Sequence, residues 1–365
     1  MKICLVCVEI FAWDKYGGFG RATRTIGREL AKRGHEIFAV VPRRTGQQAV
    51  EDLDGITVFG FSRYNPLAPI KWLKKADADI YHSCEPSFAS YLAVKAMPHK
   101  KHMVTFRDPR DWKDWKMEYE LPSLNKLQVI QNYLYENNPL VRNIIPSMDG
   151  FYTPAKFLIP KVNKMYELTH PAEFLPTPVI VPEHIQKAEK PTVCYLARLD
   201  RRKRPELFFN LAAKFPDVQF IAMGKARDKE WDSHLRNKYA DIPNIEMTGF
   251  VDQFSSKQHS QILEKSWIMV NTASREGLPN AFIESASHRC AILSHVNPDG
   301  FASEFGYHAE NDEFEHGLNY LLEDNRWKEL GGKAYSYIRE TFEMDNSIDQ
   351  HIRIYEDLIL HRRSQ

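Results

Sequence analysis

Apolar runs alternate with segments of helical periodicity along the first half of the chain. The glycine run 17–20 is followed by a pattern that places Ala22, Ile26 and Leu30 on one helix face, and Gly34 ends this predicted helix. Such alternation is typical of a parallel sheet with crossover helices. The strands predicted in this half cover residues 2–8, 36–41, 80–82, 103–106 and 143–145.

The second half repeats this alternation after a proline-rich stretch. Residues 176–191 are predicted to be a linker, because prolines interrupt regular structure there. We therefore expect domains at 1–175 and 192–345, followed over 346–365 by a helix with apolar side chains at helical spacing. The pattern predicts strands at 192–196, 218–223, 245–248 and 267–272, and helices at 205–214, 228–239 and 256–265.

The composition is that of an ordinary globular protein, with 43% hydrophobic and 27% charged residues. At 365 residues the chain has room for roughly two domains, each with its own core. The five cysteines lie mostly in apolar runs, which indicates buried thiols in a reducing compartment. The first apolar run ends at Glu9, too early for a signal peptide, and no run is long enough to span a membrane. We expect a cytoplasmic protein.

Charge is distributed unevenly, although the net charge is only +1. Residues 1–180 contain 25 Lys and Arg against 19 Asp and Glu, a net of +6, whereas the remainder contains 24 against 29, a net of −5. This asymmetry suggests that the two halves bind different ligands. The alternative explanations of the asymmetry are electrostatic attraction between the two halves across a cleft, or chance. A basic first half could also contact anionic lipid at the inner membrane face, or an anionic acceptor.

Glu276 and Glu284 bracket the segment Glu-Gly-Leu-Pro-Asn-Ala-Phe-Ile-Glu, which follows the apolar strand 267–272 and opens a helix. Pro279 suits the first helical turn, because its missing N–H would have no partner there. The next amides would then point out of a helix N-terminus, which is a natural anion site. A phosphate bound there would have a carboxylate on either side, each able to accept hydrogen bonds from the hydroxyl groups of a nucleotide-sugar. The residues expected to line this donor site are Gly277, Leu278, Pro279, Asn280, Ala281 and Glu284.

The two acids, separated by seven residues, resemble the donor-binding signature of retaining glycosyltransferases of the GT-B fold, particularly family 4, also called glycosyl transferases group 1. Glu pairs at this spacing are frequent in any charged chain, but the intervening Gly-Leu-Pro-Asn and the preceding strand favour the functional interpretation. Arg198 and Lys203, after the strand 192–196, resemble the family motif Gly-Arg-x-x-x-x-Lys. The resemblance implies that these two cations hold the donor diphosphate and stabilise it as leaving group. A solvated basic turn is the alternative, because other arginines crowd the stretch.

Three further loops resemble elements of the same family. The run 17–20 is similar to its glycine-rich loop, which implies donor-side roles for Gly18 and Gly20, since glycine lets the backbone approach a ligand closely. It does not match a dinucleotide fingerprint, because Thr23 stands where the third glycine would be. The pairs Gly224-Lys225 and Phe250-Val251 correspond to loops that enclose the nucleotide base, with ordinary turns as the alternative.

The residues after the strand 103–106 depart from the family pattern. Arg107 stands where many relatives have a His beside the transferred sugar, whereas Asp108 keeps its place. The charged and aromatic stretch that follows, with Arg110 and Trp112, is a candidate acceptor loop, or else a surface loop with packed tryptophans. Ala197 replaces the glycine of the Arg–Lys motif.

The resemblance implies an α/β protein of the GT-B fold, with two Rossmann-like domains whose parallel sheets face across a cleft and a final helix that crosses back to the first domain. It implies retaining transfer of a hexose from a nucleoside-diphosphate sugar to a hydroxyl of a carbohydrate, lipid-linked or other acceptor. Glu276 would hold sugar hydroxyls and Glu284 the ribose. The residues expected to act in catalysis are Glu276, Arg198, Lys203 and Asp108, and those expected on the acceptor side are Arg107, Arg110 and Trp112.

No metal or other cofactor is expected, because two cations and the helix amides supply the positive field and no cluster of residues has metal-ligand spacing. We expect no nucleic-acid partner. The alternatives are another GT-B enzyme, such as a sugar phosphorylase or a nucleotide-sugar epimerase, and a non-catalytic protein that binds carbohydrate or nucleotide.

Overall fold

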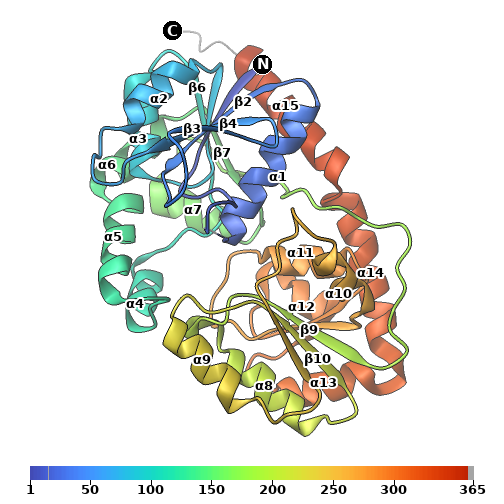
Figure 1. Ribbon diagram of the computed structural model, residues 1–365. Helices are drawn as coiled ribbons and strands as arrows, with labels where there is room; N and C mark the ends of the chain where they lie inside the picture. The colour runs from blue at the N-terminus through green and yellow to red at the C-terminus, as the bar shows by residue number, and fades with distance from the viewer. Residues whose placement is uncertain (15, 361–365) are drawn as a thin grey trace. The chain divides into compact units, whose positions relative to one another are not determined.

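A computed structural model describes residues 1–14 and 16–360. The chain divides into two compact units, each built around one sheet (Figure 1). The first unit comprises Met1–Asp111, Ile130–Pro178 and the chain from Met344 onward, and the second comprises Trp112–Val129 and Val179–Glu343. The α/β class with two parallel sheets is therefore confirmed.

The first unit contains an eight-stranded sheet of order β3-β4-β2-β1-β5-β6-β7-β8, in which only the β3–β4 pair is antiparallel. Its strands are β1 (Lys2–Val6), β2 (Glu36–Pro42), β3 (Val50–Leu53), β4 (Ile56–Phe61), β5 (Ile80–Ser83), β6 (Lys101–Thr105), β7 (Gly150–Thr153) and β8 (Glu173–Phe174). Its helices are α1 (Gly18–Lys32), α2 (Pro69–Ala76), α3 (Phe88–Ala96), α6 (Pro139–Ile144), α7 (Leu158–Tyr166) and α15 (Met344–Leu360), with a 3₁₀ turn at Ile145–Ser147. Helix α5 (Lys126–Glu136) crosses the division between the units.

Both faces of this sheet are covered by helices. Alternate side chains of a strand point to opposite faces, so Ile3 and Leu5 of β1 meet α1 and α15, whereas Cys4 and Val6 meet α2 and α3. On the first of these faces α15 contributes the fully buried Tyr355. A parallel sheet of this kind needs such cover on both sides.

The strand predicted at 143–145 is wrong. Pro139–Ile144 is helix α6, because the Asn138 side chain accepts hydrogen bonds from the amides of Leu140 and Val141 and Pro139 occupies the first helical position. The next strand is β7, a few residues later, which lies between β6 and β8. An N-cap followed by proline is a local signal that outweighs a short apolar run.

The second unit contains a six-stranded parallel sheet of order β11-β10-β9-β12-β13-β14. Its strands are β9 (Thr192–Leu196), β10 (Gln219–Met223), β11 (Ile245–Gly249), β12 (Ile268–Asn271), β13 (Ala291–Ser294) and β14 (Gly306–His308). Its helices are α4 (Trp112–Glu120), α8 (Pro205–Lys214), α9 (Lys229–Lys238), α10 (Gln258–Lys265), α11 (Asn280–Ala286), α12 (Phe301–Phe305), α13 (Phe314–Leu322) and α14 (Arg326–Thr341). Short 3₁₀ turns lie at Arg201–Lys203, Pro298–Gly300 and Glu323–Asn325.

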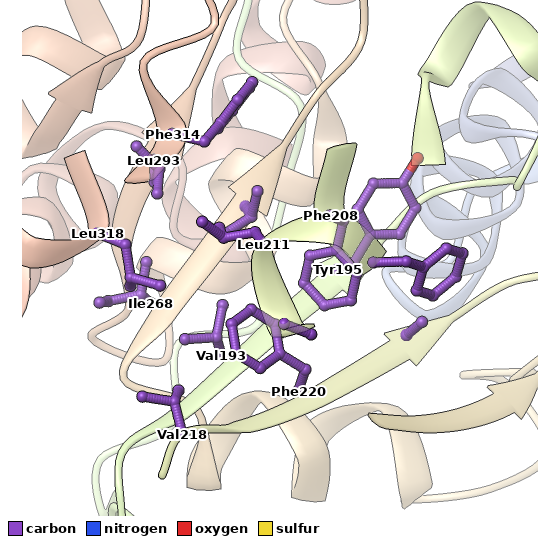
Figure 2. Close-up of a cluster of buried hydrophobic side chains, with 14 of the residues drawn as sticks. Val193, Tyr195, Phe208, Leu211, Val218, Phe220, Ile268, Leu293, Phe314 and Leu318 are labelled. Carbon is purple, nitrogen blue, oxygen red and sulfur yellow. The ribbon is translucent and has the colours of Figure 1, made fainter. Parts of the chain in front are cut away.

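The core of the second unit lies between this sheet and helices α8, α9 and α13. Figure 2 shows Val193 and Tyr195 of β9 beside Phe208 of α8 and Phe220 of β10. Phe208 contacts the Phe220 ring edge to face, with centroids 5.3 Å apart. These buried rings fix β9, whose carboxyl end carries the predicted Arg–Lys motif.

Candidate active site

The order of strands in each sheet indicates where a ligand can bind. In an open parallel sheet, ligands bind outside the carboxyl ends of the strands, at the point where the strand order reverses. In the second unit that point lies between β9 and β12, and in the first unit it lies between β1 and β5. The predicted Arg–Lys motif follows β9 and the predicted acidic motif follows β12, so both occupy the reversal point of the second sheet.

The loops after β9 and β12 are tied together by backbone contacts. The carbonyl of Lys203 accepts hydrogen bonds from the Tyr195 hydroxyl at 3.2 Å and from Thr272 Oγ1 at 2.6 Å. Arg204 adopts a left-handed conformation with φ 49° and donates from Nε to the carbonyl of Thr272 at 2.7 Å. These bonds fix the backbone of Lys203 and leave its side chain to reach the β12 loop.

Lys203 and Glu276 form an ion pair in which Nζ donates to Oε1. Lys203 is buried, and this burial lowers the pKa of its ammonium group below the usual value while the Glu276 carboxylate opposes the shift. The structure thus places the predicted phosphate-binding cation in contact with the predicted sugar-binding acid.

Arg198 lies at the carboxyl end of β9 with a donor group that is not satisfied. Its Nε is 3.4 Å from Oδ2 of the buried Asp200, but its buried Nη1 has no hydrogen-bond partner among the described residues. A buried donor without an acceptor is costly, so this position suits an anionic ligand that supplies one.

The acidic motif differs in one detail from the expectation. Pro279 is the N-cap of α11, with extended ψ of 128°, rather than a residue of the first turn. The helix begins at Asn280, and Ala281 follows in its first turn. Gly277 and Leu278 precede the cap in the connecting loop.

Glu284 lies on the buried face of α11, 9% exposed. Its Oε2 is 3.3 Å from Nε2 of the buried His259 on α10. The neighbouring His288 contacts the Glu284 carbonyl through Nδ1 at 2.8 Å, and burial lowers the pKa of His288 to about 4. Nothing in the sequence indicates that His259 accompanies Glu284, because α10 meets α11 only through tertiary packing.

The loops predicted to enclose the nucleotide base follow β10 and β11. Gly224 has φ of 150°, and a side-chain carbon there would lie 2.0 Å from the carbonyl oxygen of Ala197. Only glycine therefore fits where these two backbone segments approach each other. The Lys225 ammonium lies 6.0 Å from the centre of the Phe250 ring. Phe250 and Val251 are partly exposed at this edge.

The glycine run of the first unit is the beginning of α1 rather than a separate loop. Gly18 and Gly20 lie in the first turn of the helix, and the Gly20 amide donates to Glu9 Oε1 at 3.1 Å. A side-chain carbon on Gly20 would lie 2.8 Å from the amide nitrogen of Phe11. The glycines therefore let α1 approach the segment after β1, where Glu9 lies.

The residues after β6 belong to a buried charged network of the first unit. Arg107 donates from its amide to Glu85 Oε1 at 2.7 Å and from Nη1 to Thr177 Oγ1 at 2.9 Å. Burial raises the pKa of Glu85 well above its usual value. Arg110 pairs with Glu136 at 2.7 Å and lies 3.8 Å from Asp108.

Sequence reasoning missed Glu9 and Glu85. Each lies in the loop just after a buried strand, β1 or β5, and these strands flank the reversal point of the first sheet. An acid just beyond a buried apolar run was therefore the available signal. Trp112, predicted on the acceptor side with Arg107 and Arg110, begins α4 in the second unit and is 73% exposed.

Residues 1–14 and 16–360 contain neither a cluster of metal-binding side chains nor a helix suited to cross a membrane. No group of three His, Cys, Asp or Glu side chains is placed to hold a metal ion there. None of the helices in these ranges combines the length and apolar character needed to cross a membrane.

Comparison with solved structures shows the same fold. Sucrose-phosphate synthase from Thermosynechococcus elongatus aligns with a TM-score of 0.76 over 99% of both chains at 14% identity. HepE of Anabaena, solved in complex with UDP-glucose, aligns with a TM-score of 0.73 over 97% of this chain and 99% of its own at 12% identity. Both comparisons support the two Rossmann-like domains of the GT-B fold.

Sequence comparison assigns the family. Over 82 residues the chain is 32% identical to a glycogen synthase of Anaeromyxobacter dehalogenans, a match that spans 22% of this chain and only 17% of that relative. The family model "Glycosyl transferases group 1" matches residues 178–346, and the model "Glycosyltransferase Family 4" matches residues 16–179. With both halves matched in this order, the chain belongs to the GT-B glycosyltransferases of family 4, group 1.

Proposed function

We propose that this glycosyltransferase moves a hexose from a nucleoside-diphosphate sugar to an acceptor hydroxyl with retention of anomeric configuration. The observation that carries the proposal is the contact between Lys203 and Glu276 beside the unsatisfied Nη1 of Arg198, at the reversal point of the second sheet. Cations next to a carboxylate suit a ligand that joins a diphosphate to a polyhydroxylated ring.

Each residue then has a distinct role. Arg198 and Lys203 bind the diphosphate and stabilise the charge that develops on its oxygen as the bond to the anomeric carbon breaks. Glu276 accepts hydrogen bonds from sugar hydroxyls, and Glu284, positioned beside His259, accepts them from the ribose. The acceptor oxygen forms the new bond on the same face, and its proton passes to the leaving phosphate, so no protein base is required. The cations and the first-turn amides of α11 replace a metal ion.

Arg107 and Arg110 are assigned to the acceptor side, and Asp108, which lies beside Arg110, is kept as a catalytic residue. Arg107 and Arg110 are both held by carboxylates in the first unit, so they position the segment after β6. Acceptor hydroxyls of a carbohydrate or of a lipid-linked sugar would meet Asp108 at the end of that segment. The five free, buried cysteines support a cytoplasmic location.

A peripheral contact with anionic membrane is supported by an apolar stripe on α5. Leu127, Ile130 and Leu134 lie on one face of that helix and are 63%, 45% and 59% exposed. Lys126 lies next to this stripe. Helices that lie on an anionic bilayer combine an apolar face with Lys and Arg on the polar face, and α5 has such an apolar face with one lysine. Co-sedimentation with vesicles, compared for the native protein and Leu127→Gln/Leu134→Gln, tests this contact.

The activity is tested with a panel of nucleotide-sugars, beginning with UDP-glucose, and a panel of hydroxyl acceptors. We expect nucleoside diphosphate to be released only with an acceptor present, and NMR of the first product to show the donor's anomeric configuration. An inverted product contradicts retention. A requirement for inorganic phosphate points to a phosphorylase, conversion of the donor without acceptor to an epimerase, and binding without turnover to a non-catalytic protein.

A further inference from the structure

Helix α4 belongs to the second unit, although it follows β6 of the first unit in sequence. Its residues Asp114, Met117 and Glu118 are spaced so that they share one helix face. All three contact the loops of the candidate active site. The Arg275 Nε donates to Asp114 Oδ1 at 2.6 Å, Arg202 pairs with Glu118, and Ser274 Oγ contacts Met117 Sδ at 3.7 Å.

These ion pairs are shielded from water. The four charged side chains are between 11% and 13% exposed, in contrast to the Lys116–Glu120 pair on the same helix, whose side chains are 68% and 60% exposed. An exposed pair contributes little, whereas removal of one partner of a buried pair leaves a charge without compensation. The contacts of α4 with the two loops are therefore strong constraints on the loops.

The two arginines that pair with α4, Arg202 and Arg275, are direct sequence neighbours of the proposed catalytic residues Lys203 and Glu276. Arg202 precedes Lys203 in the turn after β9, and Arg275 precedes Glu276 in the loop after β12. The same two loops are joined by Ser274, whose amide and hydroxyl both donate to the carbonyl of Arg202 at 3.2 Å. Displacement of α4 would thus move Lys203 and Glu276 together.

We propose that α4 is a positioning element for the donor site, and that Arg202 and Arg275 are positioning residues that act through Lys203 and Glu276. The inference rests on the proposed function for the roles of those two residues. In this arrangement Asp114 and Glu118 set the separation between the phosphate-binding ammonium and the sugar-binding carboxylate. Their charge is needed, because an arginine without its carboxylate partner loses the contact that fixes its loop.

The test compares Asp114→Asn, Glu118→Gln and the double variant with the matched control Glu120→Gln on the exposed face of α4. The substitutions preserve side-chain shape and remove only the charge. We expect kcat to fall by up to about 100-fold, as small misplacements of reacting groups can produce, with KM for the nucleotide-sugar changed far less. Glu120→Gln should behave as the native protein.

Hydrogen exchange provides a readout that needs no turnover. In Asp114→Asn and Glu118→Gln we expect faster amide exchange at residues 200–206 and 273–280 than in Glu120→Gln, with β10 and β13 unchanged. If exchange rises only within α4, or if kcat holds while the melting temperature falls, α4 is merely structural and the inference is wrong. If the native protein turns over no nucleotide-sugar, the proposed function fails, while the exchange data still decide whether α4 positions the loops.

Discussion

The Lys203 ammonium donates to the Glu276 carboxylate, which joins the loops that follow the two strands at the reversal point of the second sheet. In the proposed function, a donor phosphate would therefore share the Lys203 ammonium with Glu276. Arg198, with a buried N–H that has no partner in the described chain, is the cation that can receive the phosphate without breaking this pair.

Substitution of the phosphate-binding cations should lower turnover more than stability. Arg198→Ala and Lys203→Ala each remove a charge that stabilises the leaving group, and loss of one such contact typically raises the barrier by roughly 3–4 kcal/mol. The measurement is kcat together with the melting temperature. Arg201→Ala is the matched control, because Arg201 lies in the same turn but pairs with Asp228 at 2.9 Å and contacts Trp231. Near-normal rates in both test variants would refute the motif assignment.

Activity should survive EDTA. The proposed site relies on Arg198, Lys203 and amides for its positive field, so removal of divalent ions should leave turnover unchanged. Rates are measured after chelation and after dialysis, with and without added Mg²⁺ or Mn²⁺. Restoration of a lost activity by either ion would contradict this account of the site.

The two acids should differ in their effect on nucleotide binding. Glu284→Ala should weaken the affinity for the free nucleoside diphosphate, because the ribose is present in donor and product alike. Glu276→Ala should leave that affinity unchanged or increase it, because it removes the carboxylate that competes for the Lys203 ammonium, while transfer is reduced. Calorimetry with the nucleoside diphosphate distinguishes the two outcomes. Equal losses of affinity would mean that the orientation of the donor is wrong.

Acid should destabilise the first unit through two buried imidazoles. Burial lowers the pKa of His82 well below its usual value and lowers that of His351 to about 3. The unfolded chain binds protons on these residues below about pH 6.5, whereas the folded chain does not, so stability falls as the pH falls below that value. Each imidazole contributes a loss of about 1.4 kcal/mol per pH unit until its folded pKa is reached.

The measurement is the melting temperature between pH 7.5 and 4.5 for the native protein and for His351→Gln. The variant should lose part of the pH dependence, whereas the exposed His99→Gln should retain all of it. Parallel curves for all three proteins would show that the pKa of His351 is the same in the folded and the unfolded chain, which would contradict this prediction.

Short-range signals account for the parts of the fold that the sequence predicted well. The bounds of β9 and α8 agree with the predicted ranges 192–196 and 205–214, because a buried apolar run and a proline at the first helical position are local features. The apolar run at 143–145 is instead helical, because the cap at Asn138 begins a helix that the periodicity alone does not indicate. Local patterns thus define elements when both the periodicity and the caps are considered.

Long-range contacts account for what the sequence could not predict. The contact of Lys203 with Glu276 joins residues that lie 73 positions apart, and the pairing of Arg275 with Asp114 joins residues 161 apart. Neither pairing has a signal in spacing or periodicity. The motifs predict which chemical groups form the site, but the partners of these groups, including His259 beside Glu284, depend on how the helices pack.

The return of the chain in α15 has a consequence for biosynthesis. The helix supplies Ile348 and Tyr355 to the core that also holds Ile3 and Leu5, and the Tyr355 hydroxyl contacts His82 Nδ1 at 2.8 Å. A ribosome that makes this protein therefore releases the first strands long before the segment that covers them. When the last residue of the second unit has been synthesised, α15 has not yet been made, so this face of the first sheet is covered by α1 without α15. The N-terminal half of this enzyme is the part made first and finished last.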